Sequence, residues 1–242
     1  MVGHEVRNVL TTMTYALETV YSKVKPQFAD RVRKTKTEIR EQINLLVFLA
    51  HNDDIITNPD WQLDETSVGL QGDIIAPMVD MMRAFAGHKG ITISYENFIR
   101  QGIPKFRLDK HRMDQVFYNL LSNAVKYAHY YSEIRIVYRG VLPLPGPTDQ
   151  EPHLGYVFAV LDQGIGILED EVERVFGLFE RGSRASMQCF EGQGKGLTVA
   201  QQIMRKHGGE VWFGNVGGDE TMTEVCLGIP IERALGRRTG NV

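Results

Sequence analysis

The spacing of apolar residues changes near Leu63, and this change limits the chain to a helical segment followed by a mixed α and β segment. Before it, apolar residues recur every three or four positions through 2–24 and again through 32–50, with Pro26 between the two runs. This spacing predicts two helices with heptad seams. Two antiparallel helices expose more apolar seam than they bury, which predicts a four-helix bundle made by two copies. A hairpin lying on the second segment is the alternative.

From Leu63 onward, helical patterns are interspersed with short strand patterns. We expect helices over 72–90, 113–128 and 198–209, and strands over 91–97, 133–139, 155–162, 210–215 and 224–230. Too few strand–helix–strand units occur for a doubly wound sheet, so a helix layer on a mixed, mostly antiparallel sheet is predicted. The expected fold class is α+β, with an α/β sandwich after the helical hairpin.

The same patterns set the expected domain boundaries. We expect the helical hairpin over 1–62, the sandwich over 63–234 and a tail over 235–242. The proline-rich loop 140–154 is expected to be a peripheral insertion.

Composition excludes several classes of protein. A net charge of -3 gives no basic field of the kind that binds nucleic acid. Cys189 and Cys226 are the only cysteines, and their spacing is not that of a metal site, so a reducing, cytoplasmic location is expected. The longest apolar run, residues 43–50, is too short to span a bilayer.

One face of the helix predicted over 113–128 carries four polar side chains. They are spaced by four, three and one residues: Asn119, Asn123, Lys126 and Tyr127. Amide oxygens can ligate Mg²⁺ and a lysine adds positive charge, which suits a polyphosphate and its cation. A solvated polar face would show the same pattern, so this helix alone leaves both interpretations open.

Two glycine-rich segments follow this helix. In LDQGIGI (161–167), Asp162 ends a strand and can accept a hydrogen bond from a base amine, while Gly164 and Gly166 allow close backbone approach. In GQGKGL (192–197), alternating glycines open a helix, whose N-terminal N–H groups form an anion site. A simple turn would look the same as the first segment and a glycine hinge the same as the second, and GQGKGL matches neither a Walker nor a GxGxxG motif.

Together and in this order, these segments resemble the sequence boxes of sensor histidine kinases. NLLSNAVKY (119–127) is similar to the N box, DQGIGI (162–167) to the first glycine box, VFGLFER (175–181) to the F box and GQGKGL to the second glycine box. GHEVRN (3–8) resembles the H box. The resemblance covers nearly the whole chain. It implies a dimeric helical hairpin followed by a Bergerat-type ATP-binding domain, with ATP and Mg²⁺ as cofactors.

The resemblance also assigns residues to the nucleotide. Asn123 would ligate Mg²⁺, Asp162 would read the adenine amine, and the second glycine box would hold a lid over 182–191. The full set of implied nucleotide contacts is Asn119, Asn123, Lys126, Tyr127, Asp162, Gly164, Gly166, Arg181, Gly192, Gly194, Lys195, Gly196 and Leu197. Lys195 is a less usual residue inside this box.

By the same resemblance, His4 is the phosphoacceptor. On a helical wheel His4 faces away from the apolar seam, and no second His or Cys stands at ligand spacing, which disfavours a core or metal-binding histidine. Glu5 would take the ring proton during in-line attack on the γ-phosphorus. Asn8 lies about 40° around the helix from His4 and would orient a water that dephosphorylates a partner.

The implied partners are a second copy of the chain, the receiver domain of a response regulator, and an upstream sensor domain missing from this sequence. The parent protein can be attached to a membrane. Two alternatives are a non-catalytic dimeric scaffold or phosphotransfer protein, and another ATPase of the same superfamily, such as a gyrase-type module. Intact Asn123 and Asp162 disfavour the first, and the F box with the helical hairpin disfavours the second.

Overall fold

The computed structural model describes residues 60–146, 153–180, 182–187, 194–217 and 222–236, nearly all of them in the compact unit Gln62–Val242. The hairpin predicted before Leu63 lies outside the described residues. Within them, no helix is long and apolar enough to cross a membrane.

The helices are η2 (Leu70–Ile75), α3 (Ala76–Gly87), α4 (Lys110–Tyr127), η3 (Glu169–Glu171), η4 (Arg174–Phe176), α5 (Ser183–Met187), α6 (Gly196–Lys206) and η5 (Ile231–Arg233). The strands are β1 (Glu65–Val68), β2 (Thr92–Tyr95), β3 (Phe106–Asp109), β4 (Glu133–Pro143), β5 (Leu154–Asp162), β6 (Glu210–Val216) and β7 (Thr223–Pro230).

The main sheet has five strands in the order β2-β4-β5-β7-β6. Only the β2–β4 pair is parallel, and the other three pairs are antiparallel. This arrangement confirms the predicted mixed, mostly antiparallel sheet. The register of the β5–β7 pair sets Asp162, the last residue of β5, opposite Thr223, the first residue of β7. A separate antiparallel pair, β1 with β3, leads into α4.

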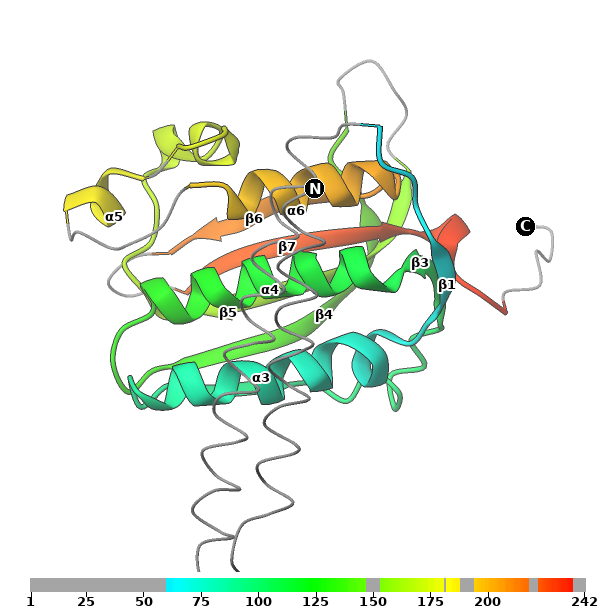
Figure 1. Cartoon of the computed structure of the whole chain (residues 1–242), viewed down its shortest axis with the longest axis horizontal. Helices are drawn as coiled ribbons and strands as arrows, with labels where there is room; N and C mark the ends of the chain where they lie inside the picture. The colour runs from blue at the N-terminus through cyan, green and yellow to red at the C-terminus, as the bar shows by residue number, and fades with distance from the viewer. Residues whose placement is uncertain (1–59, 147–152, 181, 188–193, 218–221, 237–242) are drawn as a thin grey trace, which may run out of the picture. The chain divides into compact units, whose positions relative to one another are not determined.

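Helices α3, α4 and α6 cover one face of this sheet (Figure 1). The start of α4 is fixed by Asp109, whose Oδ1 accepts a hydrogen bond from the backbone N–H of Arg112 at 3.0 Å. Along α4, Val116, Leu120 and Ala124 recur at helical spacing and are all buried. Because one stripe of the helix packs inward, its polar stripe is held in a fixed direction beside α6.

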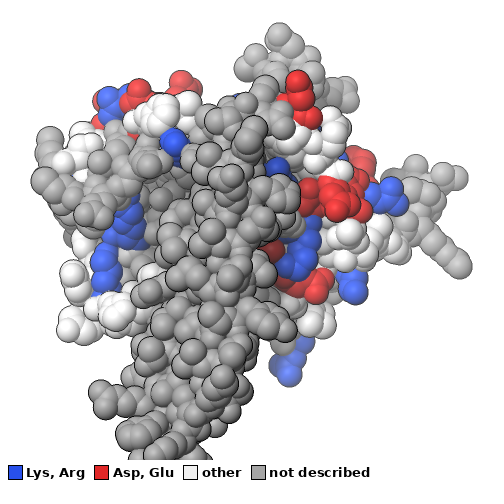
Figure 2. Space-filling model, in the orientation of Figure 1, with Lys and Arg blue, Asp and Glu red and all other residues white. Residues whose placement is uncertain are grey.

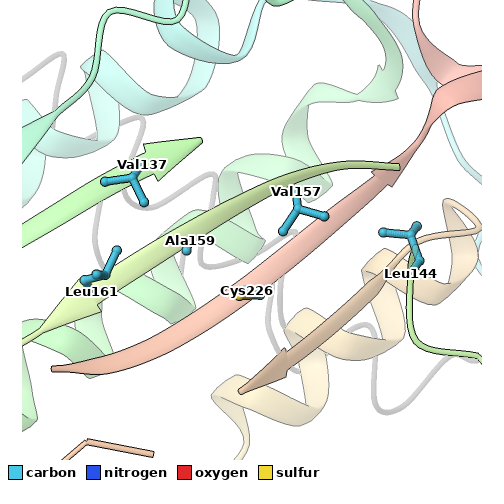
Figure 3. Packing of buried hydrophobic residues seen from close by; sticks show 6 residues of the cluster. All are labelled: Val137, Leu144, Val157, Ala159, Leu161 and Cys226. Atoms are coloured by element: carbon cyan, nitrogen blue, oxygen red, sulfur yellow. The ribbon is translucent and has the colours of Figure 1, made fainter. Parts of the chain in front are cut away.

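The opposite face of the sheet carries a second apolar cluster (Figure 3). Its members are Val137, Leu144, Val157, Ala159, Leu161 and Cys226. Leu144 lies over two glycines of the sheet, since a Cβ on Gly155 would come within 2.7 Å of its side chain and one on Gly228 within 2.2 Å. The segment 140–154, predicted as a peripheral insertion, therefore continues β4 to Pro143 and packs one residue against the sheet.

The helix predicted over 72–90 differs in its first turn. It begins at Leu70 with a π-helical turn, in which the N–H of Ala76 bonds to the carbonyl of Gln71, and it becomes α-helical at Ala76. Pro77 has no N–H to continue the usual ladder. The sequence patterns also missed β1 and β3, because four residues are too few to show an alternation.

Candidate nucleotide-binding site

The polar stripe of α4 meets the first residue of α6. A Cβ built on Gly196 would lie 3.5 Å from Asn119 Oδ1 and 3.6 Å from Asn123 Nδ2. Two predicted segments that are more than seventy residues apart are thus in contact, and the N-terminus of an eleven-residue helix faces two amide side chains. The free N–H groups of a helix N-terminus attract anions. This contact is the centre of the candidate site.

The Asn119 side chain gives the clearest indication of a ligand site. Asn119 is 3% exposed. Within the described ranges, its Nδ2 is the one buried side-chain nitrogen or oxygen that has no hydrogen-bond partner. Leaving a buried donor unsatisfied costs about 1–3 kcal/mol. A phosphate oxygen is an acceptor that would satisfy it.

The donor set at this site also fits a hydrated divalent cation. The described part of the chain contains no group of three or more His, Cys, Asp or Glu that could hold a metal ion. Asn123, half-buried and one turn after Asn119, offers an amide oxygen. Magnesium commonly takes one or two protein oxygens and completes its shell with phosphates and water, so this residue type fits it.

Asp162 ends β5 in a buried position, at 6% exposure. Burial raises the pKa of this carboxyl to about 7, and a hydrogen bond with the Thr223 side chain partly opposes that shift. Thr223 was not among the residues predicted from sequence, and the strand register is what brings it to Asp162. A buried carboxyl paired with a hydroxyl is suited to accept a hydrogen bond from a base amine.

The turn after Asp162 packs against the end of α4. A Cβ on Gly164 would lie 2.5 Å from the carbonyl oxygen of Tyr127 and 2.6 Å from Asp162 Oδ1, so only glycine fits there. Gly166 has a φ of 64°, which favours glycine for a conformational reason. The Ile165 N–H donates to the Tyr127 carbonyl at 3.2 Å. We call residues 163–166 the glycine turn.

Lys126 and Tyr127 contact each other at the end of α4. The Lys126 ammonium donates to the Tyr127 hydroxyl at 2.8 Å and lies 4.5 Å from the centroid of its ring. The two residues, both predicted to contact the nucleotide, therefore lie against each other, one turn beyond Asn123.

The F-box segment meets the start of α6 through backbone contacts. The Thr198 hydroxyl donates to the carbonyls of Phe176 and Gly177 at 2.8 and 3.0 Å. The Phe179 N–H donates to the Gly194 carbonyl at 3.0 Å, and the Lys195 ammonium lies 5.3 Å from the Phe179 ring centroid. The predicted residues Gly194, Lys195, Gly196 and Leu197 follow one another at this point.

Two residues that the sequence motifs did not indicate anchor the short helix α5. The buried Glu171 carboxylate accepts hydrogen bonds from the Ser183 N–H, at 3.0 Å for its nearer oxygen. Arg184 donates to the carbonyl of Ile165 in the glycine turn at 2.7 Å. No sequence signal links these residues, because each contact joins segments that are distant in the chain. They fix the described start of the predicted lid against the turn.

Several predicted site residues lie outside the described residues. These are His4, Glu5, Asn8, Arg181 and Gly192. Figure 2 shows the charged side chains on one face of the molecule. Lys and Arg side chains lie at the left of the view, and both signs of charge are mixed along the upper edge and at the right. An anionic ligand near the cationic side chains at the left would be attracted to them.

The sequence of the chain is similar to those of known proteins. Residues 108–233 match the family of histidine kinase-, DNA gyrase B- and HSP90-like ATPases. The chain is 26% identical over 231 residues to the methanogenesis regulatory histidine kinase FilI of Methanothrix harundinacea, covering 95% of this chain and 24% of that protein. It is also 26% identical over 232 residues to the sensor histidine kinase WalK of Bacillus subtilis, covering 93% of this chain and 35% of that protein. The chain thus spans about a third or less of these relatives' lengths.

Among solved structures, full-length ShkA in complex with AMPPNP is similar in fold. The TM-score is 0.58 at 22% sequence identity, and the match covers 95% of this chain and 44% of that one.

Proposed function

The chain belongs to the family of histidine kinase-, DNA gyrase B- and HSP90-like ATPases, and we propose that it is the catalytic core of a sensor histidine kinase that phosphorylates His4 with ATP. The observation that carries this proposal is the buried, unpartnered amide nitrogen of Asn119, which lies beside the N-terminus of α6. The FilI and WalK names support a histidine kinase rather than another ATPase.

Nucleotide binding would use the residues at the end of β5 and those where α4 meets the N-terminus of α6. Asp162, with Thr223, would accept a hydrogen bond from the adenine amine. Asn119, the N-terminus of α6 and the ammoniums of Lys126 and Lys195 would contact the phosphates. Mg²⁺, ligated by the Asn123 amide oxygen, would neutralise negative charge on the phosphates. Tyr127 would meet the ribose region, and Arg181 and Gly192 would complete the phosphate contacts.

The phosphoryl transfer would take place at His4. An imidazole nitrogen of His4 attacks the γ-phosphorus in line, a nitrogen–phosphorus bond forms, and the bond from that phosphorus to the bridging oxygen breaks. The bridging oxygen leaves with ADP, and Glu5 accepts the ring proton. The phosphoryl group then passes to an aspartate of a response regulator. Asn8 would orient a water molecule in the opposite task of dephosphorylating that regulator.

We also propose that the chain acts as a cytoplasmic homodimer. Two heptad seams over residues 2–57 need more apolar partners than one hairpin supplies. Analytical ultracentrifugation at tens of micromolar is expected to give a dimer. A monomer at that concentration would contradict this part of the proposal.

Incubation with γ-labelled ATP tests the function directly. The chain is expected to acquire a label that acid removes and base does not, and His4→Ala should abolish this label while it leaves ATP binding intact. Asn123→Ala and Asp162→Ala should each weaken nucleotide binding in calorimetry. ATP hydrolysis without any label on the chain would indicate another kind of ATPase. Absence of nucleotide binding would favour a non-catalytic scaffold or phosphotransfer protein.

A further inference from the structure

The C-terminal end of α4 receives an ammonium from another element. The last four carbonyls of an α-helix have no N–H partner within the helix. Two of them in α4, those of Val125 and Lys126, accept hydrogen bonds from Lys89 Nζ at 3.0 and 2.7 Å. The same ammonium donates to the carbonyl of Ala128, just beyond the helix, at 3.2 Å. One lysine thus contacts three backbone carbonyls within four residues at a single helix end.

This contact is chemically well matched. A lysine ammonium has three N–H donors and no acceptor, and three carbonyl oxygens surround it. The carbonyl end of a helix also carries partial negative charge, which favours a cation there. Burial lowers the pKa of the Lys89 amine, as expected for a charge that has exchanged water for these carbonyls.

The end of α3 places Lys89 at this position. Helices α3 and α4 lie side by side and end at the same side of the domain (Figure 1). The Ile91 N–H bonds back to the Ala86 carbonyl at 3.0 Å, across Gly90, whose φ is 66°. This is the left-handed glycine ending of a helix. A Cβ on Gly90 would lie 2.5 Å from the Tyr131 ring, so that ring lies directly against the glycine that ends the helix.

The remaining contacts of the α4 end lead to the glycine turn. The Tyr127 carbonyl accepts from the Ile165 N–H, and the His129 N–H donates to the Gln163 carbonyl at 2.8 Å. The last turn of α4 is therefore held between two supports, the glycine turn on one side and Lys89 on the other. That turn also carries the side chains of Lys126 and Tyr127.

We propose that Lys89 is a positioning residue of the nucleotide site: its ammonium fixes the last turn of α4 and so sets where Lys126 and Tyr127 lie relative to the glycine turn. Lys89 itself does not touch the nucleotide. The inference rests on the proposed nucleotide binding, and it assigns an effect on that binding to a residue outside the sequence motifs.

The test compares three variants of the chain by calorimetry with a non-hydrolysable ATP analogue and Mg²⁺. Lys89→Met keeps the apolar stem but removes the donors, and it should weaken binding roughly 3- to 30-fold, the range typical of substitutions within a coupling network. Lys89→Arg restores charge and donors and should recover most of that loss. Lys110→Met is the matched control, since Lys110 pairs with Asp114 at the opposite end of the same helix. It should leave the affinity unchanged.

Amide hydrogen exchange without nucleotide provides an independent reading. In Lys89→Met, the amides of Ile165 and His129 should exchange faster, while the buried amide of Val199 in α6 should not change. A merely stabilising role would lower the melting temperature of Lys89→Met but leave its affinity, measured well below melting, equal to that of the wild type. That result would overturn the proposal. If the wild type itself failed to bind the analogue, the proposed function would fall, and the exchange data would still decide whether Lys89 holds the glycine turn.

Discussion

Replacing Asp162 with Asn should stabilise the nucleotide-free chain, and increasingly so as pH rises. Burial raises the pKa of Asp162 from its ordinary 3.8 to about 7 in the folded chain. Between these values the folded state keeps a proton that the unfolded state releases. The free energy of unfolding therefore falls as pH rises from 3.8 towards 7. The stabilising contribution of the protonated Asp162 is fully present only below the unfolded pKa. Asn cannot ionise, so the variant lacks this loss.

The size of the effect follows from the two pKa values. They differ by about three, and each unit corresponds to about 1.36 kcal/mol, so the ionised carboxylate costs the fold about 4 kcal/mol above pH 7. Between pH 5 and pH 8 about two of these units are crossed, which amounts to about 3 kcal/mol. For a chain of this size that corresponds to about 6–12 °C in melting temperature.

Thermal unfolding followed by circular dichroism, from pH 5 to pH 8 without nucleotide, measures this difference. The melting temperature of Asp162→Asn should exceed that of the wild type by a margin that grows across the range, while calorimetry should show weaker nucleotide binding. Thr223→Val removes the hydroxyl that lowers the Asp162 pKa, so the decline of its stability should extend to higher pH. A margin that stays constant from pH 5 to pH 8 would refute the reasoning.

Three further outcomes are expected. Gly164→Ala places a Cβ 2.5 Å from a backbone carbonyl and should lower stability by about 1–3 kcal/mol in chemical denaturation, whereas Gly87→Ala, which meets nothing within 4 Å, should be neutral or stabilising by up to about 1 kcal/mol. Leu144→Ala should cost about 2–5 kcal/mol without changing nucleotide affinity in calorimetry; a changed affinity would link that sheet face to the site. Asn8→Ala should spare phosphorylation of His4 and slow dephosphorylation of the regulator by about 10²–10⁴, as followed with the labelled proteins. Loss of the His4 label in Asn8→Ala would contradict the water-orienting role.

The elements with a strong local pattern could be predicted from the sequence. Apolar residues at helical spacing indicated α4, and the observed helix differs by only a few residues at each end, since it begins after the Asp109 cap and ends at Tyr127. The side-by-side placement of Asn119 and Asn123 follows from the same periodicity. Their contact with Gly196 does not, because it depends on how two helices pack over the sheet.

Contacts between distant segments explain what the sequence did not show. Thr223 reaches Asp162 through strand register, and Lys89 reaches the end of α4 across more than thirty residues. Neither residue stands in a recognisable motif, and a lone lysine or threonine has no periodicity of its own. Leu144 was hidden for a related reason. A proline-rich segment resembles a surface loop. Leu144 can pack on the sheet because the two residues beneath its side chain are glycines, and their position is known only from the structure.

The hydrogen bond between Phe179 and Gly194 has a consequence for engineering the chain. It brings Phe179 and Gly194, the two ends of the intervening stretch, next to each other. Lengthening a closed loop is inexpensive in entropy, at about 0.6 kcal/mol for each doubling. Gly194 itself is not exchangeable, since its φ is 68° and a Cβ there would lie 2.6 Å from the Glu180 carbonyl. A variant library that changes the number of residues between Phe179 and Gly194 should therefore keep Gly194 itself, because the backbone pairing that closes the stretch depends on it.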